Sequence, residues 1–225
     1  MTNDIKFKLA LESNRNMNNS IMYLYGDILD DSNETTEVIT PAGVRKLLEQ
    51  VTTDNITIHL NSYGGSVFAS IAICNMLKDS KKNITCVIDG IAASGASLIA
   101  VSCNSLKMPE NTMLMIHRAS TLGFGNAKDF QKIANTLADI DKTTVITTLM
   151  TKFNKSEKEL FKLLDAETWL SAQRAFELGL CDEVLTDEDK NGEKTESADN
   201  KAIENFIRGF LKLKVKGEMI NNANL

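Results

Sequence analysis

The order of apolar patterns between residues 55 and 104 constrains the fold more than any other feature of this sequence. "NITIHLNS" (55–62) alternates apolar and polar side chains, which is the two-residue period of a half-buried strand. "SVFASIAICNMLKDS" (66–80) is typical of a helix, "ITCVIDG" (84–90) of a second strand and "ASLIAVSCN" (96–104) of a second helix. Strands that are separated by helices usually pair in parallel, so we expect an α/β fold.

The same alternation continues on both sides of this stretch. Within 127–153, apolar side chains recur every three or four residues, as on one face of a helix. Before this stretch we expect a strand (21–26) and a helix (40–51) with Thr40 as N-cap and Pro41 in its first turn. After it we expect two short strands around the turn at 109–111, a long helix (127–153), a shorter helix (156–164), a strand (167–170) and a helix (171–179). The segment 181–185 closes the core.

A change of composition divides the chain. After Leu185 the sequence becomes polar and charged, as in a linker. We therefore expect an N-terminal segment (1–20), a core domain (21–185), a polar linker (186–201) and a C-terminal amphipathic tail (202–225). The tail either packs on its own body or a sister subunit, or binds a partner.

Charge and cysteine usage exclude several classes of protein. The net charge of −5 gives no basic footprint for nucleic acid. The longest uncharged run, between Asp89 and Lys107, contains several serines and is a poor membrane span. The start of the chain lacks a secretory pattern, and the four cysteines form no Cys-x-x-Cys pair. We expect Cys74, Cys86 and Cys103 to be buried free thiols, the protein to be cytoplasmic, and no metal or cofactor to be bound.

Ser94 lies in the uncharged stretch "GIAASGASLIA" (90–100), between an expected strand and an expected helix. At such a turn the first N–H groups of the helix have no partner inside it, and they favour negative charge. A nucleophilic serine needs such donors for its oxyanion intermediate. On this stretch alone, however, small residues that let a helix pack closely are the better explanation.

Two further stretches could complete a site around Ser94. Gly64 and Gly65 directly follow a strand, where glycines can adopt positive φ and present N–H groups to a ligand. His117 ends an apolar strand 23 residues after Ser94, so both could converge at one edge of the sheet. The other histidine, His59, lies inside a strand and is interpreted as an ordinary residue of the sheet face.

A histidine base also needs an orienting carboxylate, which would fix its tautomer and stabilise the imidazolium. Asp165 and Glu167, in "LLDAETWLSA" (163–172), are both candidates. They lie two positions apart, so both could face the same way on an extended segment.

Taken together, these stretches resemble the Clp protease proteolytic subunit (ClpP) family of serine peptidases. The resemblance covers about residues 20–185, and its motifs occur in the family's order and spacing. They are Asn61-Ser62-x-Gly64-Gly65-Ser66-Val67, Gly90-x-Ala92-Ala93-Ser94, Met115-Ile116-His117 and "ETWLSAQRAFELGLCDEV". "MPENTMLMIH", "AETWLSA" and the Gly95-Ala96 pair after Ser94 look more like phage and prophage head maturation proteases of this type than like the housekeeping subunit.

The resemblance implies the roles of the site residues. Ser94 would be the nucleophile, and His117 the general base and then the general acid. The backbone N–H groups of Gly65 and Gly95 would form the oxyanion hole. Counting back from the aromatic-Leu-Ser-Ala segment places the family's aspartate position at Glu167, which we take as the third member.

The resemblance also implies a ClpP/crotonase-like α/β fold of repeated ββα-type units with a protruding handle helix. In this family protomers assemble into homo-oligomeric rings that admit extended polypeptide substrates. The partners would be capsid or scaffold proteins in head maturation, or a Clp ATPase in general proteolysis. The N-terminal segment does not resemble the housekeeping segment that engages an ATPase, which favours head maturation.

Two other classes of function remain as alternatives. A crotonase-type acyl-CoA enzyme shares the sheet and the oxyanion hole, but it does not need Ser94 paired with His117. A catalytically inactive assembly subunit would keep the scaffold without a working carboxylate.

Overall fold

The computed structural model describes residues 10–14, 18–31 and 38–186. The chain divides into two units, residues 1–186 and 187–225, and the described residues all belong to the first. The expected linker beyond Thr186 and the C-terminal tail (202–225) therefore lie outside the described residues.

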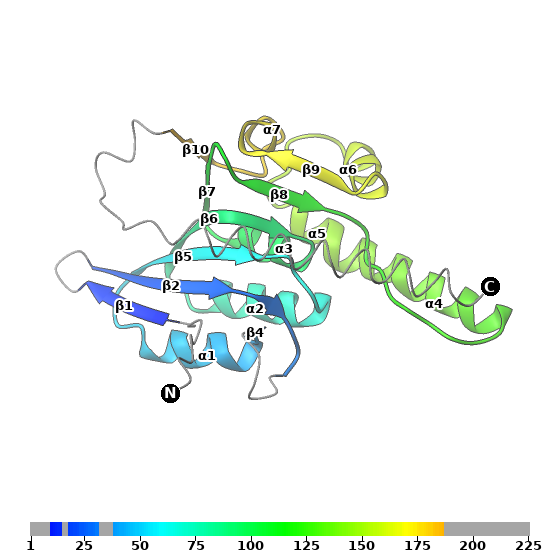
Figure 1. The fold of residues 1–225 in the computed structure, drawn as a ribbon, viewed down its shortest axis with the longest axis horizontal. Coiled ribbons are helices and arrows are strands. Elements are labelled where there is room, and N and C mark those ends of the chain that lie inside the picture. Colours follow the sequence, from blue (N-terminus) through cyan, green and yellow to red (C-terminus); the bar gives the residue numbers. More distant parts are fainter. Residues whose placement is uncertain (1–9, 15–17, 32–37, 187–225) are drawn as a thin grey trace, which may run out of the picture. The chain divides into compact units, whose positions relative to one another are not determined.

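A mostly parallel, eight-stranded sheet organises the described part of the chain (Figure 1), as the sequence predicts. Its main path runs β1 (Ala10–Asn14), β2 (Asn19–Tyr25), β5 (Asn55–Ser62), β6 (Asn83–Ala93), β7 (Ser105–Pro109) and β10 (Glu183–Leu185). β8 (Met113–Ile116) pairs with β6 and with β9 (Thr168–Ser171), and β3 (Asp27–Ile28) pairs with β4 (Val38–Ile39). Only the β1–β2 and β8–β9 pairs of these sheets are antiparallel.

Strand β1 lies within the segment that the sequence places before the core domain. It forms an antiparallel pair with β2, from Ala10 opposite Tyr23 to Asn14 opposite Asn19. The sheet therefore begins about ten residues earlier than the expected core domain.

Helices pack with the sheet around one hydrophobic core. They are α1 (Pro41–Gln50), α2 (Val67–Asp79), α3 (Gly95–Ser102), α6 (Glu157–Asp165) and α7 (Ala172–Glu177). The Thr40 side chain accepts a hydrogen bond from the Gly43 N–H at 3.0 Å, and Pro41 is the first helical residue, as expected. Strands β2 and β5 alternate buried and half-buried residues, so their apolar side chains enter one core with these helices. All four cysteines are buried and free, which confirms the prediction for Cys74, Cys86 and Cys103.

The expected long helix (127–153) is present, but it ends at Leu149 and is not α-helical throughout. The structure has α4 (Ala127–Ile140), a π-helical segment η2 (Asp141–Ile146) and a short α5 (Thr147–Leu149). No residue of α4 is buried, whereas Asp141, Val145 and Ile146 are buried in η2. The wider π turn alters the angular spacing of the side chains that follow, so the helix changes from an exposed rod (Figure 1) to a wall of the core.

Strand β6 is long enough to pair with two different strands on one side. Thr85–Val87 pair with β7, and Ile91–Ala93 pair with β8. This split brings the end of β8 beside the end of β6. Within the described residues, no helix is both long and apolar enough to cross a membrane.

Candidate active site

Ser94 lies at the turn between β6 and α3, and its backbone has a conformation that residues other than glycine rarely adopt. Its φ is 54° and its ψ is −125°. The Ser94 N–H donates to the Met115 carbonyl oxygen at 3.0 Å, which ties this turn to β8. Such a strained turn at the end of a strand exposes the side chain and is a common feature of active sites.

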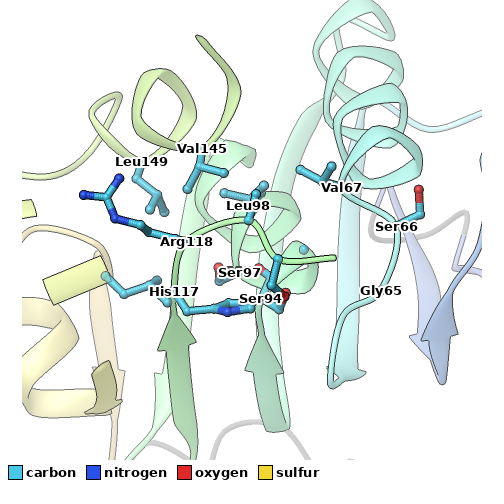
Figure 2. Close-up of a pocket in the computed structure, with 14 residues that line it drawn as sticks. Gly65, Ser66, Val67, Ser94, Ser97, Leu98, His117, Arg118, Val145 and Leu149 are labelled. Carbon is cyan, nitrogen blue, oxygen red and sulfur yellow. Dashed lines mark hydrogen bonds between the residues drawn. The ribbon is translucent and has the colours of Figure 1, made fainter. Parts of the chain in front are cut away.

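His117 reaches Ser94 because of the register between β6 and β8. Ala93 lies opposite Met115, so the residues that leave both strands lie side by side. The Ser94 Oγ and the His117 Nε2 are 2.7 Å apart, within hydrogen-bond distance. Figure 2 shows the two side chains meeting in front of α3.

The glycine pair after β5 lies against the same turn. Gly64 and Gly65 have φ of 94° and 145°, conformations that favour glycine. The Ile28 N–H donates to the Gly64 carbonyl oxygen, and the Ser66 N–H donates to the Ile28 carbonyl oxygen, both at 2.8 Å. In this parallel bridge the N–H of Gly65 points away from Ile28.

Gly95 is the first residue of α3, so helix geometry provides no internal acceptor for its N–H. A side chain on Gly64 would lie 2.8 Å from the Gly95 nitrogen and 2.8 Å from the Ser94 Cβ, so the two turns are in close contact. Two backbone donors therefore lie beside the serine, and the N-terminus of α3 adds a partial positive charge there.

A pocket of about 270 Å³ opens at this point (Figure 2). Gly65, Ser94, Gly95 and His117 all line it, so the structure brings together four of the five predicted site residues. The other walls come from β8, from α2 and its N-cap, from α3, η2 and α5, and from the segment after His117. They are mainly apolar or small: Ser66, Val67, Ser97, Leu98, Ile116, Arg118, Ala119, Ser120, Val145 and Leu149.

The fifth predicted residue, Glu167, is close in register but is not bonded to the histidine. Ile116 lies opposite Thr168 in the β8–β9 pair, so the next residues along are His117 and Glu167. Glu167 is exposed, with a φ of 46°. Among the described residues its carboxylate makes no hydrogen bond with His117.

The alternative acid, Asp165, has a different partner. Its carboxylate pairs with the Nε of Arg118, and this hydrogen bond holds the pKa of Asp165 below its usual range. The hydrogen bond to Asp165 in turn raises the pKa of Arg118. Asp165 is therefore engaged by the residue after His117 and not by His117 itself.

Sequence reasoning missed Asp141, which is buried behind the site. Its carboxylate accepts hydrogen bonds from the Arg118 Nη1 at 3.1 Å and from the Ala119 N–H at 2.7 Å. An aspartate among the exposed charges of a long helix pattern gives no sign of burial. A basic residue directly after His117 was the signal available in the sequence.

His59 lies on the half-buried face of the sheet, as expected. Its Nδ1 is 2.8 Å from the Asp89 Oδ1, and its ring stacks on Tyr23 with the ring centres 5.1 Å apart. The Tyr25 hydroxyl donates to the other Asp89 oxygen, and burial together with this carboxylate raises the pKa of Tyr25. His59 does not line the pocket.

Comparison with known proteins agrees with this geometry. The family model described as Clp protease matches residues 10–188, most of the chain. This chain belongs to the Clp protease family. The match includes every residue that lines the pocket, and it also includes β1, which precedes the expected core domain.

Curated members of the Clp protease family resemble the chain at about 30% identity. It is 29% identical over 133 residues to an ATP-dependent Clp protease proteolytic subunit of Bacteroides fragilis, covering 58% of this chain and 64% of that protein. It is 31% identical over 134 residues to subunit 2 of Thermobifida fusca (59% and 66%) and 32% identical over 135 residues to subunit 1 of Chlamydia trachomatis (58% and 69%). The aligned region thus spans slightly less than two thirds of the first of these relatives.

Proposed function

We propose that this protein is a serine endopeptidase with Ser94 as nucleophile and His117 as general base. The observation that carries the proposal is the 2.7 Å contact between the Ser94 Oγ and the His117 Nε2, at a strained turn that opens into a pocket. A serine is a weak nucleophile unless an adjacent base takes its proton. Membership of a protease family supports the same chemistry.

The proposed reaction begins when His117 Nε2 accepts the Ser94 proton and the Oγ attacks the carbonyl carbon of a peptide bond. The tetrahedral intermediate places its oxyanion between the N–H groups of Gly65 and Gly95. His117 then donates the proton to the leaving amine, and water hydrolyses the acyl-serine with the same histidine as base.

Glu167 is the proposed third member, which would accept a hydrogen bond from His117 Nδ1. Register supports this choice, because Glu167 follows the Ile116–Thr168 pair on the opposite strand. The exposed glutamate has to change its side-chain rotamer to reach the imidazole. Asp165 is less suited, because Arg118 already holds its carboxylate.

Exposed apolar side chains in α4 and in the segment before it support a homo-oligomeric assembly. Phe130 is 51% exposed, and Leu122 and Phe124, in the segment before the helix, are 96% and 98% exposed. Large side chains that are left in water at one place mark an interaction surface. We propose that this surface is the handle through which rings of the protein associate.

The biological substrate has two candidates. The phage-like motifs around Ser94, His117 and Glu167 favour head maturation, in which the enzyme cuts a scaffold or capsid precursor. The curated relatives are named ATP-dependent Clp protease proteolytic subunits, which favours a partner ATPase. Incubation with a candidate capsid or scaffold protein, with and without a Clp ATPase and ATP, separates the two by showing which mixture yields mapped cuts.

A fluorophosphonate probe tests the peptidase chemistry itself. The wild-type protein is expected to be labelled at Ser94, and Ser94→Ala to lose all labelling. Labelling of Ser94→Ala at the wild-type level would refute the nucleophile. A folded wild-type protein that takes no label and cleaves no peptide would favour an inactive assembly subunit, and hydratase activity on an acyl-CoA would favour the crotonase class.

A further inference from the structure

A buried carboxylate lies directly behind the histidine, and the proposed reaction gives it no role. Asp141 is only 3% exposed. Its two oxygens accept from the Arg118 Nη1 at 3.1 Å and from the Ala119 N–H at 2.7 Å. A buried carboxylate is costly unless it is paired and hydrogen-bonded, so these two bonds are what make its burial tolerable. Both partners belong to the two residues that follow His117.

Arg118 extends this contact to a second carboxylate. Its Nε pairs with Asp165 at the end of α6, and its guanidinium carbon lies 4.9 Å from the centre of the Phe161 ring. A planar guanidinium presents several donors in a fixed fork, so it can bridge two acids at once. Figure 2 shows the Arg118 side chain directed away from Ser94, so the guanidinium faces this support and not the serine.

His117 depends on this support because strand pairing ends just before it. The last pair of β8 with β9 joins Ile116 to Thr168. Among the described residues, the next backbone hydrogen bond after that pair is donated by the Ala119 N–H to the Asp141 carboxylate. A misplacement of about 1 Å in a catalytic group costs roughly 10²-fold in rate.

We propose that Asp141 and Arg118 are positioning residues for His117. The Asp141 carboxylate holds residues 118 and 119 and thereby keeps the imidazole within hydrogen-bond distance of Ser94. This inference rests on the proposed peptidase function. Asp165 holds the other side of Arg118 and contributes less, because its side chain is 58% exposed and an exposed ion pair is screened by water.

The proposed role of Asp141 explains why the helix becomes π-helical at this residue. Asp141 is the first residue of η2, immediately after an α4 that buries none of its residues. The change of helical geometry at this point allows a carboxylate from an exposed helix to enter the space behind the site. π turns of this kind often mark functional sites.

Steady-state cleavage of a short fluorogenic peptide by the full-length protein tests the proposal. In Asp141→Asn the amide oxygen still accepts from the Ala119 N–H, but the charge opposite Arg118 is lost. We expect kcat to fall about tenfold to hundredfold in Asp141→Asn and in Arg118→Gln, with KM changed less than threefold. Asp139→Asn, an exposed aspartate on α4 two residues earlier, is the matched control and should leave both constants unchanged.

A double variant and an active-site titration exclude a merely structural role. Two residues that act through one contact give a non-additive cycle, so Asp141→Asn with Arg118→Gln should lose no more than the worse single variant. The fluorophosphonate should still label every chain of each variant at the end point, only more slowly.

Three results would overturn the positioning role. The first is a kcat per labelled site within threefold of wild type in either single variant. The second is a loss of kcat in the double variant that equals the product of the two single losses. The third is a loss of activity that is fully explained by a smaller number of labelled sites. If Asp141→Asn does not fold, the half-exposed Arg118→Gln is judged by the first and third criteria. A wild type that neither cleaves peptide nor takes label rejects the peptidase function itself, which is a different failure.

Discussion

Replacement of Gly65 by alanine tests the proposed oxyanion hole where the structure leaves least room. A Cβ on Gly65 would lie 2.1 Å from the Ile28 carbonyl oxygen. Cβ atoms in proteins essentially never approach another heavy atom more closely than 3.0 Å. The backbone therefore has to move by about 1 Å, and the Gly65 N–H moves with it. A displacement of that size costs roughly 10²-fold, and loss of one oxyanion donor costs about 10²–10³ in kcat.

We therefore expect Gly65→Ala to lower kcat by about 10²–10³ while KM changes little. The strained φ of 145° should also lower the free energy of unfolding by about 1–3 kcal/mol. The kinetics of peptide hydrolysis measure the change in kcat, and urea unfolding measures the change in the free energy of unfolding.

Gly43→Ala is the matched control, because Gly43 lies within α1 and alanine is favoured there. This variant should keep wild-type kcat and unfold at the same or slightly higher urea concentration. A folded Gly65→Ala with kcat within threefold of wild type would refute the assignment of its N–H to the oxyanion hole.

Three further predictions follow from other parts of the molecule. Glu167→Gln should lower kcat by roughly 10³–10⁴, whereas Asp165→Asn should lower it by less than about tenfold, and peptide kinetics showing the reverse order would transfer the orienting role to Asp165. Phe130→Glu should reduce the size of the assembled particle in sedimentation velocity, because a charge enters the exposed apolar surface formed with Leu122 and Phe124, and an unchanged size would remove this surface from the interface. Burial raises the pKa of Cys74 from 9.0 to about 12, so the unfolded thiol ionises first and the free energy of unfolding should fall as pH rises from about 9 to 12. This thiol contributes at most about 1.4 kcal/mol per pH unit; Cys74→Ala should flatten the slope in urea unfolding, and an unchanged slope contradicts the reasoning.

Local pattern in the sequence was enough to predict most of the fold. The alternation in 55–62 predicts β5 with its bounds, and Thr40 with Pro41 predicts the start of α1. These features depend on neighbours a few residues apart, which the sequence displays directly. Ser94 and His117 were candidates because each lies where a recognisable strand ends, but their roles came from the resemblance to the family and not from local pattern.

Contacts between distant residues had no such signal. The bridge that turns the Gly65 N–H away from Ile28 depends on β3, which has only two residues and so no period to detect. The π turn at Asp141 follows an apolar pattern that continues as if the helix were regular.

The sequence by itself therefore determined the α/β class, the family, and which serine and histidine could react. Only the tertiary structure decided that these two side chains lie 2.7 Å apart, that Arg118 engages Asp165 on one side, and that Asp141 is buried behind the histidine. The physical reason is that periodicity and capping act within one element, whereas the site is set by the register of β6 with β8 and by a guanidinium that joins three elements.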